Sequence, residues 1–132
     1  MNYLLDTHSF LWSLFSPDQL SKSAMEEIKS PDNDVSISVI TLWEISLKYA
    51  LGKLELEGIK PEELPEYAGE TGVDILSLNP LDAASFHKLP RFEHKDPFDR
   101  LLIWQAIQQK LVLISKDSQF EKYRAFGLKR FW

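Results

Sequence analysis

Residues 94–117 read HKDPFDRLLIWQAIQQKLVLISKD, a helical pattern that leads straight into an apolar run. Asp96 and Pro97 are typical of an N-cap followed by proline at the first helical position, and they predict that the longest helix of the chain covers Pro97 to Lys110. The apolar run Leu111 to Ile114 follows at once and predicts a buried strand. A long helix that leads directly into a buried strand favours an α/β protein with a mostly parallel sheet.

The same alternation of helical patterns and short apolar runs extends along the rest of the chain. Further strands are predicted at Tyr3 to Leu5, Val35 to Val39, Val73 to Leu76 and, as a last strand or tail, Leu128 to Phe131. Further helices are predicted at Thr7 to Leu14, Ser21 to Lys29, Thr41 to Leu51, Pro61 to Gly69, Asn79 to Lys88 and Ser118 to Tyr123. We therefore expect a three-layer α/β/α architecture, formed by one domain that covers residues 1–132.

Composition removes several classes of site. The chain is 44% hydrophobic and 27% charged, as globular proteins are, and it has no cysteine, so disulfides, zinc–thiolate sites, iron–sulfur clusters and a thiol nucleophile are excluded. Glycine-rich phosphate loops, a GxSxG elbow and a HExxH zinc motif are absent. The sequence shows neither a signal peptide nor an apolar run near the roughly 20 residues that cross a bilayer, so we expect a cytoplasmic protein without membrane contact.

The charge is acidic overall but unevenly distributed. The formal net charge is −5, which argues mildly against binding nucleic acid through bulk charge alone. Residues 54–74 are rich in acids, whereas residues 110–132 are rich in bases. Such runs are typical of solvated helix faces, and the alternative is a basic face for RNA or an acidic partner.

Acidic residues recur where the predicted elements meet. Asp6 directly follows the first strand, and Asp117 follows the strand that ends at Ile114, so both are expected at the carboxyl edge of a parallel sheet. Glu44 lies in the first turn of a predicted helix, and Asp96 and Asp99 begin the longest one. Carboxylates about 4 Å apart repel by roughly 4 kcal/mol per pair at an effective dielectric constant near 20. Gathering them requires a cation, and oxygen ligands suit Mg²⁺ or Mn²⁺.

Each of these acids also has a purely structural interpretation as part of a helix cap. The matching patterns are Asp6 before Thr7, the box from Thr41 to Glu44, Asp96 and Asp99 around Pro97, and the box from Ser118 to Glu121. Asp117 lies outside the last box and has no obvious capping role. His94, in the loop before Asp96, either touches a substrate or orders the turn.

Four short motifs together resemble the PIN domain. They are Leu-Leu-Asp6-Thr7, Trp-Glu44-Ile, His94-Lys-Asp96-Pro-Phe-Asp99-Arg100 and Ile-Ser115-Lys-Asp117. The third, followed by a long helix, is the most specific, and the resemblance covers essentially the whole chain. It is strongest to the VapC-like toxin ribonucleases of bacterial and archaeal toxin–antitoxin pairs.

The resemblance implies a PIN-like fold and a Mg²⁺- or Mn²⁺-dependent endoribonuclease. The implied catalytic and metal-binding acids are Asp6, Glu44, Asp99 and Asp117, with Asp96 as an outer or alternative ligand. Thr7 and Ser115 match supporting positions, while Arg100 and Lys116, beside site acids, are candidate contacts for RNA phosphates. The implied partners are an RNA substrate, a cognate VapB-like antitoxin and a second copy of the chain in a homodimer.

Two other functions are compatible with parts of the sequence. A non-catalytic PIN-like interaction module would keep the fold and use the acids as caps. A haloacid-dehalogenase-like phosphatase also begins with an aspartate after its first strand, but it requires a second aspartate where this chain has His8. Metal-dependent RNA cleavage that one acid substitution abolishes separates the enzyme from the module.

Overall fold

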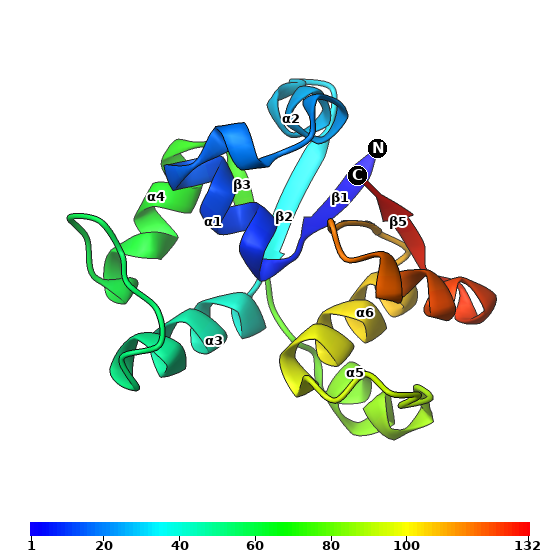
Figure 1. Ribbon diagram of the computed structural model, residues 1–132. Helices are drawn as coiled ribbons and strands as arrows, with labels where there is room; N and C mark the ends of the chain where they lie inside the picture. The colour runs from blue at the N-terminus through cyan, green and yellow to red at the C-terminus, as the bar shows by residue number, and fades with distance from the viewer.

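The computed structural model describes residues 1–132 and contains a five-stranded sheet at its centre (Figure 1). The strand order is β3-β2-β1-β4-β5, and all four pairings are parallel. The strands are β1 (Asn2–Leu5), β2 (Asp34–Ser38), β3 (Val73–Leu76), β4 (Val112–Ile114) and β5 (Lys129–Phe131). The predicted parallel sheet is therefore confirmed, and the segment left open as strand or tail is a true edge strand.

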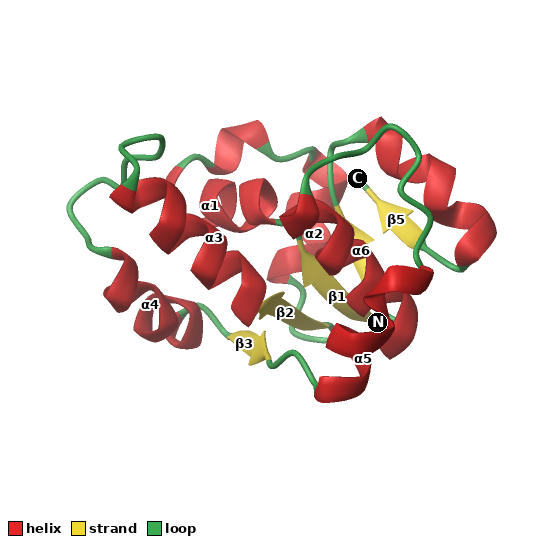
Figure 2. Ribbon diagram, turned by 90° about the horizontal axis from the view of Figure 1, so that it is seen from below, coloured by secondary structure: helices red, strands yellow, loops and turns green.

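Helices connect the strands and enclose the sheet (Figure 2). They are α1 (Thr7–Phe15), α2 (Lys22–Lys29), α3 (Val39–Ala50), α4 (Leu64–Glu70), α5 (Pro80–Ser85) and α6 (Pro97–Gln109), with short 3₁₀ helices at η1 (Pro17–Gln19), η2 (Pro61–Glu63), η3 (Phe86–Lys88) and η4 (Ser118–Phe126). No helix is long and apolar enough to span a bilayer.

Alternating strand residues supply the two cores of the α/β/α sandwich. On one face, Tyr3 and Leu5 of β1 join a buried cluster with Phe10 of α1 and Ile45 of α3. On the other face, Leu4 packs in a second cluster that includes residues of β4, α6 and η4. Because both faces of β1 are fully covered, the strand reads as a continuous apolar run, as the sequence predicts.

The start of α3 differs from the prediction. Ser38, the last residue of β2, is the N-cap: its hydroxyl accepts a hydrogen bond from the backbone N–H of Ile40 and donates one to Gln105 of α6. Thr41 lies inside the helix, so the predicted capping box from Thr41 to Glu44 is wrong. Ser38 satisfies the cap instead, and it frees the Glu44 side chain for other contacts.

The carboxyl ends of β1, β2 and β4 meet at one edge of the sheet. β1 and β4 pair in register from Tyr3 with Val112 to Leu5 with Ile114, and the Asp6 N–H extends this ladder by donating to the Ile114 carbonyl at 3.1 Å. α6 leads into β4 and runs back along the sheet, so its first turn lies at the same edge (Figure 1). The topology thus brings every predicted acid to one place.

Candidate active site

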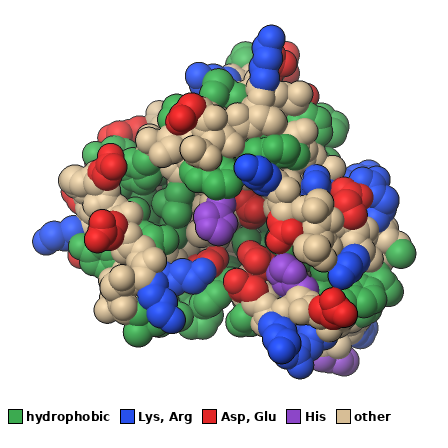
Figure 3. Space-filling view, in the orientation of Figure 1, with side chains coloured by type: hydrophobic (Ala, Val, Ile, Leu, Met, Phe, Trp, Pro, Cys, Tyr) green, Lys and Arg blue, Asp and Glu red, His purple; other side chains and the backbone are tan.

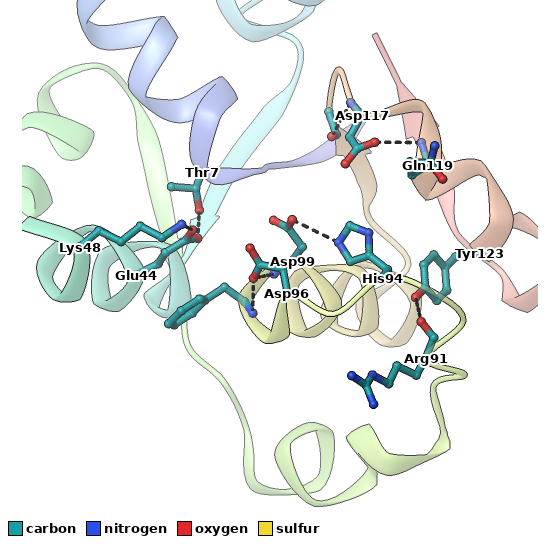
Figure 4. Close-up of polar contacts among 12 residues, drawn as sticks. Thr7, Glu44, Lys48, Arg91, His94, Asp96, Asp99, Asp117, Gln119 and Tyr123 are labelled. Atoms are coloured by element: carbon teal, nitrogen blue, oxygen red, sulfur yellow. Dashed lines mark hydrogen bonds and ion pairs between the residues drawn. The ribbon is translucent and has the colours of Figure 1, made fainter. Parts of the chain in front are cut away.

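Acidic side chains gather in a hollow on the face shown in Figure 3, with histidine side chains on either side of them. The close-up shows Glu44 and Lys48 of α3 on one side of this group and His94 and Asp117 on the other, with Asp99 between them (Figure 4). Three elements that are distant in sequence supply these residues. The predicted convergence of acids at the carboxyl edge of the sheet is therefore observed.

Asp6 is the buried member of the group. It is the N-cap of α1, and its Oδ1 accepts a hydrogen bond from the Ser9 N–H at 2.8 Å. The residue is 7% exposed. Burial raises the pKa of the Asp6 carboxyl, although hydrogen bonds from Ser115 and Ser9 oppose this effect. Asp6 thus has the predicted capping role, and its negative charge also acts on Asp99.

Glu44 is held by hydrogen bonds on both of its oxygens. Its Oε1 accepts from the hydroxyl of Thr7 at 2.6 Å, and its Oε2 pairs with the ammonium of Lys48, one turn later on α3. Thr7 also lies 3.2 Å from the hydroxyl of Thr41. The predicted supporting residue Thr7 therefore fixes a site carboxylate directly.

The two acids at the start of α6, Asp96 and Asp99, make different contacts. Asp96 is the N-cap, and its Oδ1 accepts from the N–H groups of Phe98 and Asp99 at 2.8 and 3.2 Å. The Asp99 side chain is not used in the cap, and its Oδ2 lies 3.2 Å from Nε2 of His94. His94 also packs edge-on against the ring of Phe120. Pro97 at the first helical position accounts for this division, as the sequence predicts.

Asp117 follows β4 and caps η4. Its Oδ1 accepts from the Gln119 N–H at 2.9 Å, which corrects the expectation that Asp117 has no capping role. The fully buried Ser115 accepts a hydrogen bond from the Asp117 N–H at 3.1 Å. Ser115 therefore holds the loop that presents Asp117.

The electrostatics of the site show that its negative charge is not balanced. Burial raises the pKa of Asp99 to about 8, together with the charges of four neighbours: Asp96, Glu44, Asp6 and Asp117. A carboxyl group with such a pKa keeps its proton at neutral pH unless a cation is added. The group as a whole thus favours binding of a positive charge.

The donor set fits a divalent cation. His94, Asp99 and Asp117 each offer one ligand atom, and these atoms lie within 4.8 Å of one another. Carboxylate oxygens suit Mg²⁺ and Mn²⁺, and a single imidazole nitrogen is compatible with Mn²⁺. Such an ion requires several oxygen ligands that lie close to one another. The residues present therefore fit the divalent metal ion that the sequence implies.

The two predicted phosphate-binding residues differ in their surroundings. Arg100 is half-buried: its guanidinium stacks on the ring of Phe86 at 4.8 Å and donates to the Leu89 carbonyl at 3.2 Å. Lys116 is exposed between β4 and Asp117, with its ammonium 5.9 Å from the ring of Trp12. Of the two, Lys116 has the side chain that is free to meet a ligand.

Sequence reasoning missed Lys48 and left the role of His94 open. Lys48 follows Glu44 by four residues on one helix, and this spacing is typical of an ion pair, so the pair could have been predicted from the sequence. His94 precedes Asp99 by five residues across a loop and a helix start, and no regular periodicity predicts their contact. Only the path of the loop before α6 places that imidazole against the carboxylate.

Comparison with known proteins identifies the fold family. Residues 3–125 match the family model of the PIN domain. Among curated proteins, the chain is 27% identical over 121 residues to Ribonuclease VapC22 of Mycobacterium tuberculosis (strain ATCC 25618 / H37Rv), a match that covers 92% of this chain and 91% of that protein. These matches give no support to the haloacid-dehalogenase-like alternative.

Solved structures agree on the fold. VapBC2 from Rickettsia felis, bound to a DNA fragment from its promoter, superposes with a TM-score of 0.72 at 20% identity, covering 99% of this chain and 98% of that chain. VapBC-1 from nontypeable Haemophilus influenzae superposes with a TM-score of 0.66 at 21% identity, covering 99% and 97%. These likenesses show the same fold, and the family model, which matches nearly the full length, establishes that the chain belongs to the PIN domain family.

Proposed function

We propose that the chain is a divalent-metal-dependent endoribonuclease and the toxin of a toxin–antitoxin pair. The observation that carries this proposal is the convergence of His94, Asp99 and Asp117, with ligand atoms within 4.8 Å of one another, in a group of acids that raises the pKa of Asp99 to about 8. Membership of the PIN family and the similarity to Ribonuclease VapC22 support ribonuclease activity.

Each site residue has a separate task in this proposal. His94, Asp99 and Asp117 would hold the cation, and Asp6 adds a buried negative charge beside them. Glu44 completes the set of four catalytic acids, and Thr7 orients its carboxylate. Asp96 caps α6 and thereby leaves Asp99 free. A bound divalent ion supplies Lewis-acid chemistry, since it lowers the pKa of water and offsets negative charge on the phosphate.

The expected products follow from attack by water on phosphorus. The new bond joins the water oxygen to phosphorus, and the bond from phosphorus to the 3′ oxygen breaks. One fragment then carries a 5′-phosphate and the other a 3′-hydroxyl. Next to His94, a polar pocket of about 270 Å³ is lined by Glu93, His94, Gln119 and Lys122. We assign a neighbouring nucleotide of the RNA to this space, since its polar lining matches a ribose phosphate.

The proposed partner is a VapB-like antitoxin that inhibits the nuclease. Several structures with the same fold are VapBC complexes, and they support such a partner here. The net charge of −5 and the uncovered acids of the site favour an inhibitory segment with basic side chains. The chain would then be harmful to its cell only when it is free of that segment.

We also propose a homodimer. Trp43, Leu47 and Leu51 follow one another at four-residue spacing along α3 and its C-cap, and they are 59%, 38% and 59% exposed. An apolar row of this kind is expensive to leave in water and is typical of an interface. Sedimentation of the wild-type chain and of Leu47→Glu tests this assignment. The wild-type chain is expected to sediment as a dimer and the variant as a monomer.

Sequencing of RNA ends after induced expression tests the proposed function in the cell. Wild-type chain is expected to stop growth and to produce new 5′-phosphate ends at a limited set of RNA sites. Asp99→Asn serves as the matched control, because it replaces one carboxylate oxygen with an amide nitrogen and leaves the Asp96 cap in place. Normal growth with unchanged RNA ends in both cultures, at good soluble yield, would contradict the toxin role and favour the non-catalytic module.

A further inference from the structure

Lys48 lies inside the acid group, and the proposed function gives it no task. Its ammonium pairs with Oε2 of Glu44, and no other lysine or arginine forms an ion pair with one of the four site acids. The Glu44 side chain is 4% exposed and that of Lys48 is 34% exposed. A buried carboxylate paired with a half-buried ammonium is a fixed charge pair of the fold, unlike a surface ion pair.

The Glu44 carboxylate is already engaged on both oxygens. Thr7 donates to one oxygen at 2.6 Å, and Lys48 occupies the other. Lys48 also faces the acids at the start of α6 and lies 6.0 Å from the ring of Phe98. Lys48 donates a hydrogen bond to Glu44, and although burial lowers the pKa of Lys48, this bond and the charges of Glu44, Asp96 and Asp99 raise it.

The opposite end of the site has a different composition. The ligand atoms that lie within 4.8 Å of one another belong to His94, Asp99 and Asp117, and Glu44 is not in this group. No ammonium or guanidinium pairs with Asp99 or Asp117. The acid group therefore has one end, at Glu44, that contains the ammonium of Lys48, and one end, at Asp99 and Asp117, that contains no lysine or arginine partner (Figure 4).

We propose that Lys48 acts as a built-in cation at the Glu44 end of the site and thereby limits the site to one divalent ion, held at the end formed by His94, Asp99 and Asp117. The inference rests on the proposed function and specifies its metal stoichiometry. Lys48 is a positioning residue: it neutralises Glu44 and repels a second cation from that end. Glu44 then acts as a fixed, neutralised carboxylate beside the metal rather than as the ligand that the sequence predicts.

Binding of Mn²⁺ tests this inference without measuring cleavage. The free Mn²⁺ signal in electron paramagnetic resonance gives the number of ions bound per chain at neutral pH. Wild-type chain is expected to bind one ion, and Lys48→Met two, because the methionine removes the ammonium and leaves Glu44 charged. Lys48→Arg should restore a stoichiometry of one. Lys53→Met, a matched change at an exposed lysine just beyond α3, should also leave it at one.

A double variant covers the case in which Lys48→Met does not fold. Combining Lys48→Met with Glu44→Gln removes both charges of the buried pair and keeps the shape of both side chains. This variant is expected to fold and to bind one Mn²⁺ with an affinity close to that of the wild-type chain. Loss of Mn²⁺ binding in the double variant would contradict the inference, because Glu44 would then be a required ligand.

The remaining outcomes separate the two proposals. Two ions bound to wild-type chain, or one ion bound to both wild-type and Lys48→Met, would overturn the role of Lys48 and leave a metal-dependent nuclease standing. An absence of Mn²⁺ binding in every variant, the wild-type chain included, would overturn the proposed function and this inference together.

Discussion

Asp96 and Asp99 are three residues apart on the same helical turn, yet their carboxylates serve different purposes. Oδ1 of Asp96 accepts from the N–H groups of Phe98 and Asp99, whereas Oδ2 of Asp99 lies 3.2 Å from Nε2 of His94. A capping carboxylate is committed to the backbone, and its neighbour at the third helical position is free to bind a cation. This relationship makes the two acids experimentally separable.

We predict that Asp99→Asn lowers the rate of RNA cleavage by about 100-fold or more. Even substitutions of residues that only hydrogen-bond to metal ligands lower metal affinity or activity by about 10- to 100-fold. Asp96→Asn keeps a good capping group and should retain activity within about 10-fold of the wild-type chain. Initial rates on one RNA substrate, with circular dichroism to verify the fold, provide the measurement. An inactive Asp96→Asn beside an active Asp99→Asn would reverse the assignment.

The raised pKa of Asp99 predicts a pH-dependent stability of the metal-free chain. The unfolded carboxyl has a pKa of 3.8, and burial and the neighbouring carboxylates raise the pKa of the folded group to about 8, so the folded state binds the proton more tightly. This contribution to stability is complete below pH 4 and is lost as the pH rises to about 8. In EDTA, the melting temperature of the wild-type chain should therefore fall across this window.

Two comparisons check the origin of that pH dependence. Asp99→Asn should flatten the decline and melt higher than the wild-type chain at pH about 8, by about 3 °C or more, which corresponds to about 1 kcal/mol in a domain of this size. Added Mn²⁺ should raise the melting temperature of the wild-type chain and have a smaller effect on the variant. Parallel pH curves for the two proteins in EDTA would show that Asp99 does not carry the effect.

The hydroxyl of Ser38 joins β2, α3 and α6. It caps α3 through Ile40 and donates to Gln105, and both Ser38 and Gln105 are fully buried. Ser38→Ala should lower the free energy of unfolding by about 1–3 kcal/mol, because it removes a cap and leaves a buried amide oxygen without a donor. Urea denaturation measures the loss, with Ser23→Ala at an exposed position of α2 as the control. Equal stability of the two variants would contradict this role.

Lys116 and Arg100 should respond differently to removal of their charge. Lys116→Ala is expected to weaken RNA binding and to reduce the slope of log affinity against log salt by about one, whereas the same change at Lys22, on α2, should have no effect. Arg100→Ala should instead destabilise the fold, because its guanidinium packs on Phe86. Fluorescence anisotropy with Asp99→Asn as background measures binding without cleavage. A salt slope that Lys116→Ala leaves unchanged would remove Lys116 from the RNA interface.

The sequence predicted the parts of the fold that depend on local patterns. Short apolar runs located the strands, and the capping residue Asp96 with Pro97 located the start of α6. The positions of Asp6 and Asp117 directly after two parallel strands predicted that they lie at the same edge of the sheet. The start of α3 was missed because the pattern from Thr41 to Glu44 also matches a capping box. Ser38 caps the helix through the N–H of Ile40, and its hydroxyl is held there by a tertiary contact with Gln105 that no local pattern contains. For the same reason, the partner of His94 and the raised pKa of Asp99 required the three-dimensional arrangement.

RNA cleavage by this chain is expected to depend on a divalent ion bound to the acid group, and the chemistry of the RNA ends checks this claim. Purified chain, incubated with a 5′-labelled RNA in Mg²⁺ or Mn²⁺, is predicted to release fragments with 3′-hydroxyl and 5′-phosphate ends and to stop when EDTA is added. The same preparation of Asp99→Asn should release none. Full cleavage in EDTA, or fragments that end in 2′,3′-cyclic phosphate, would contradict the claim.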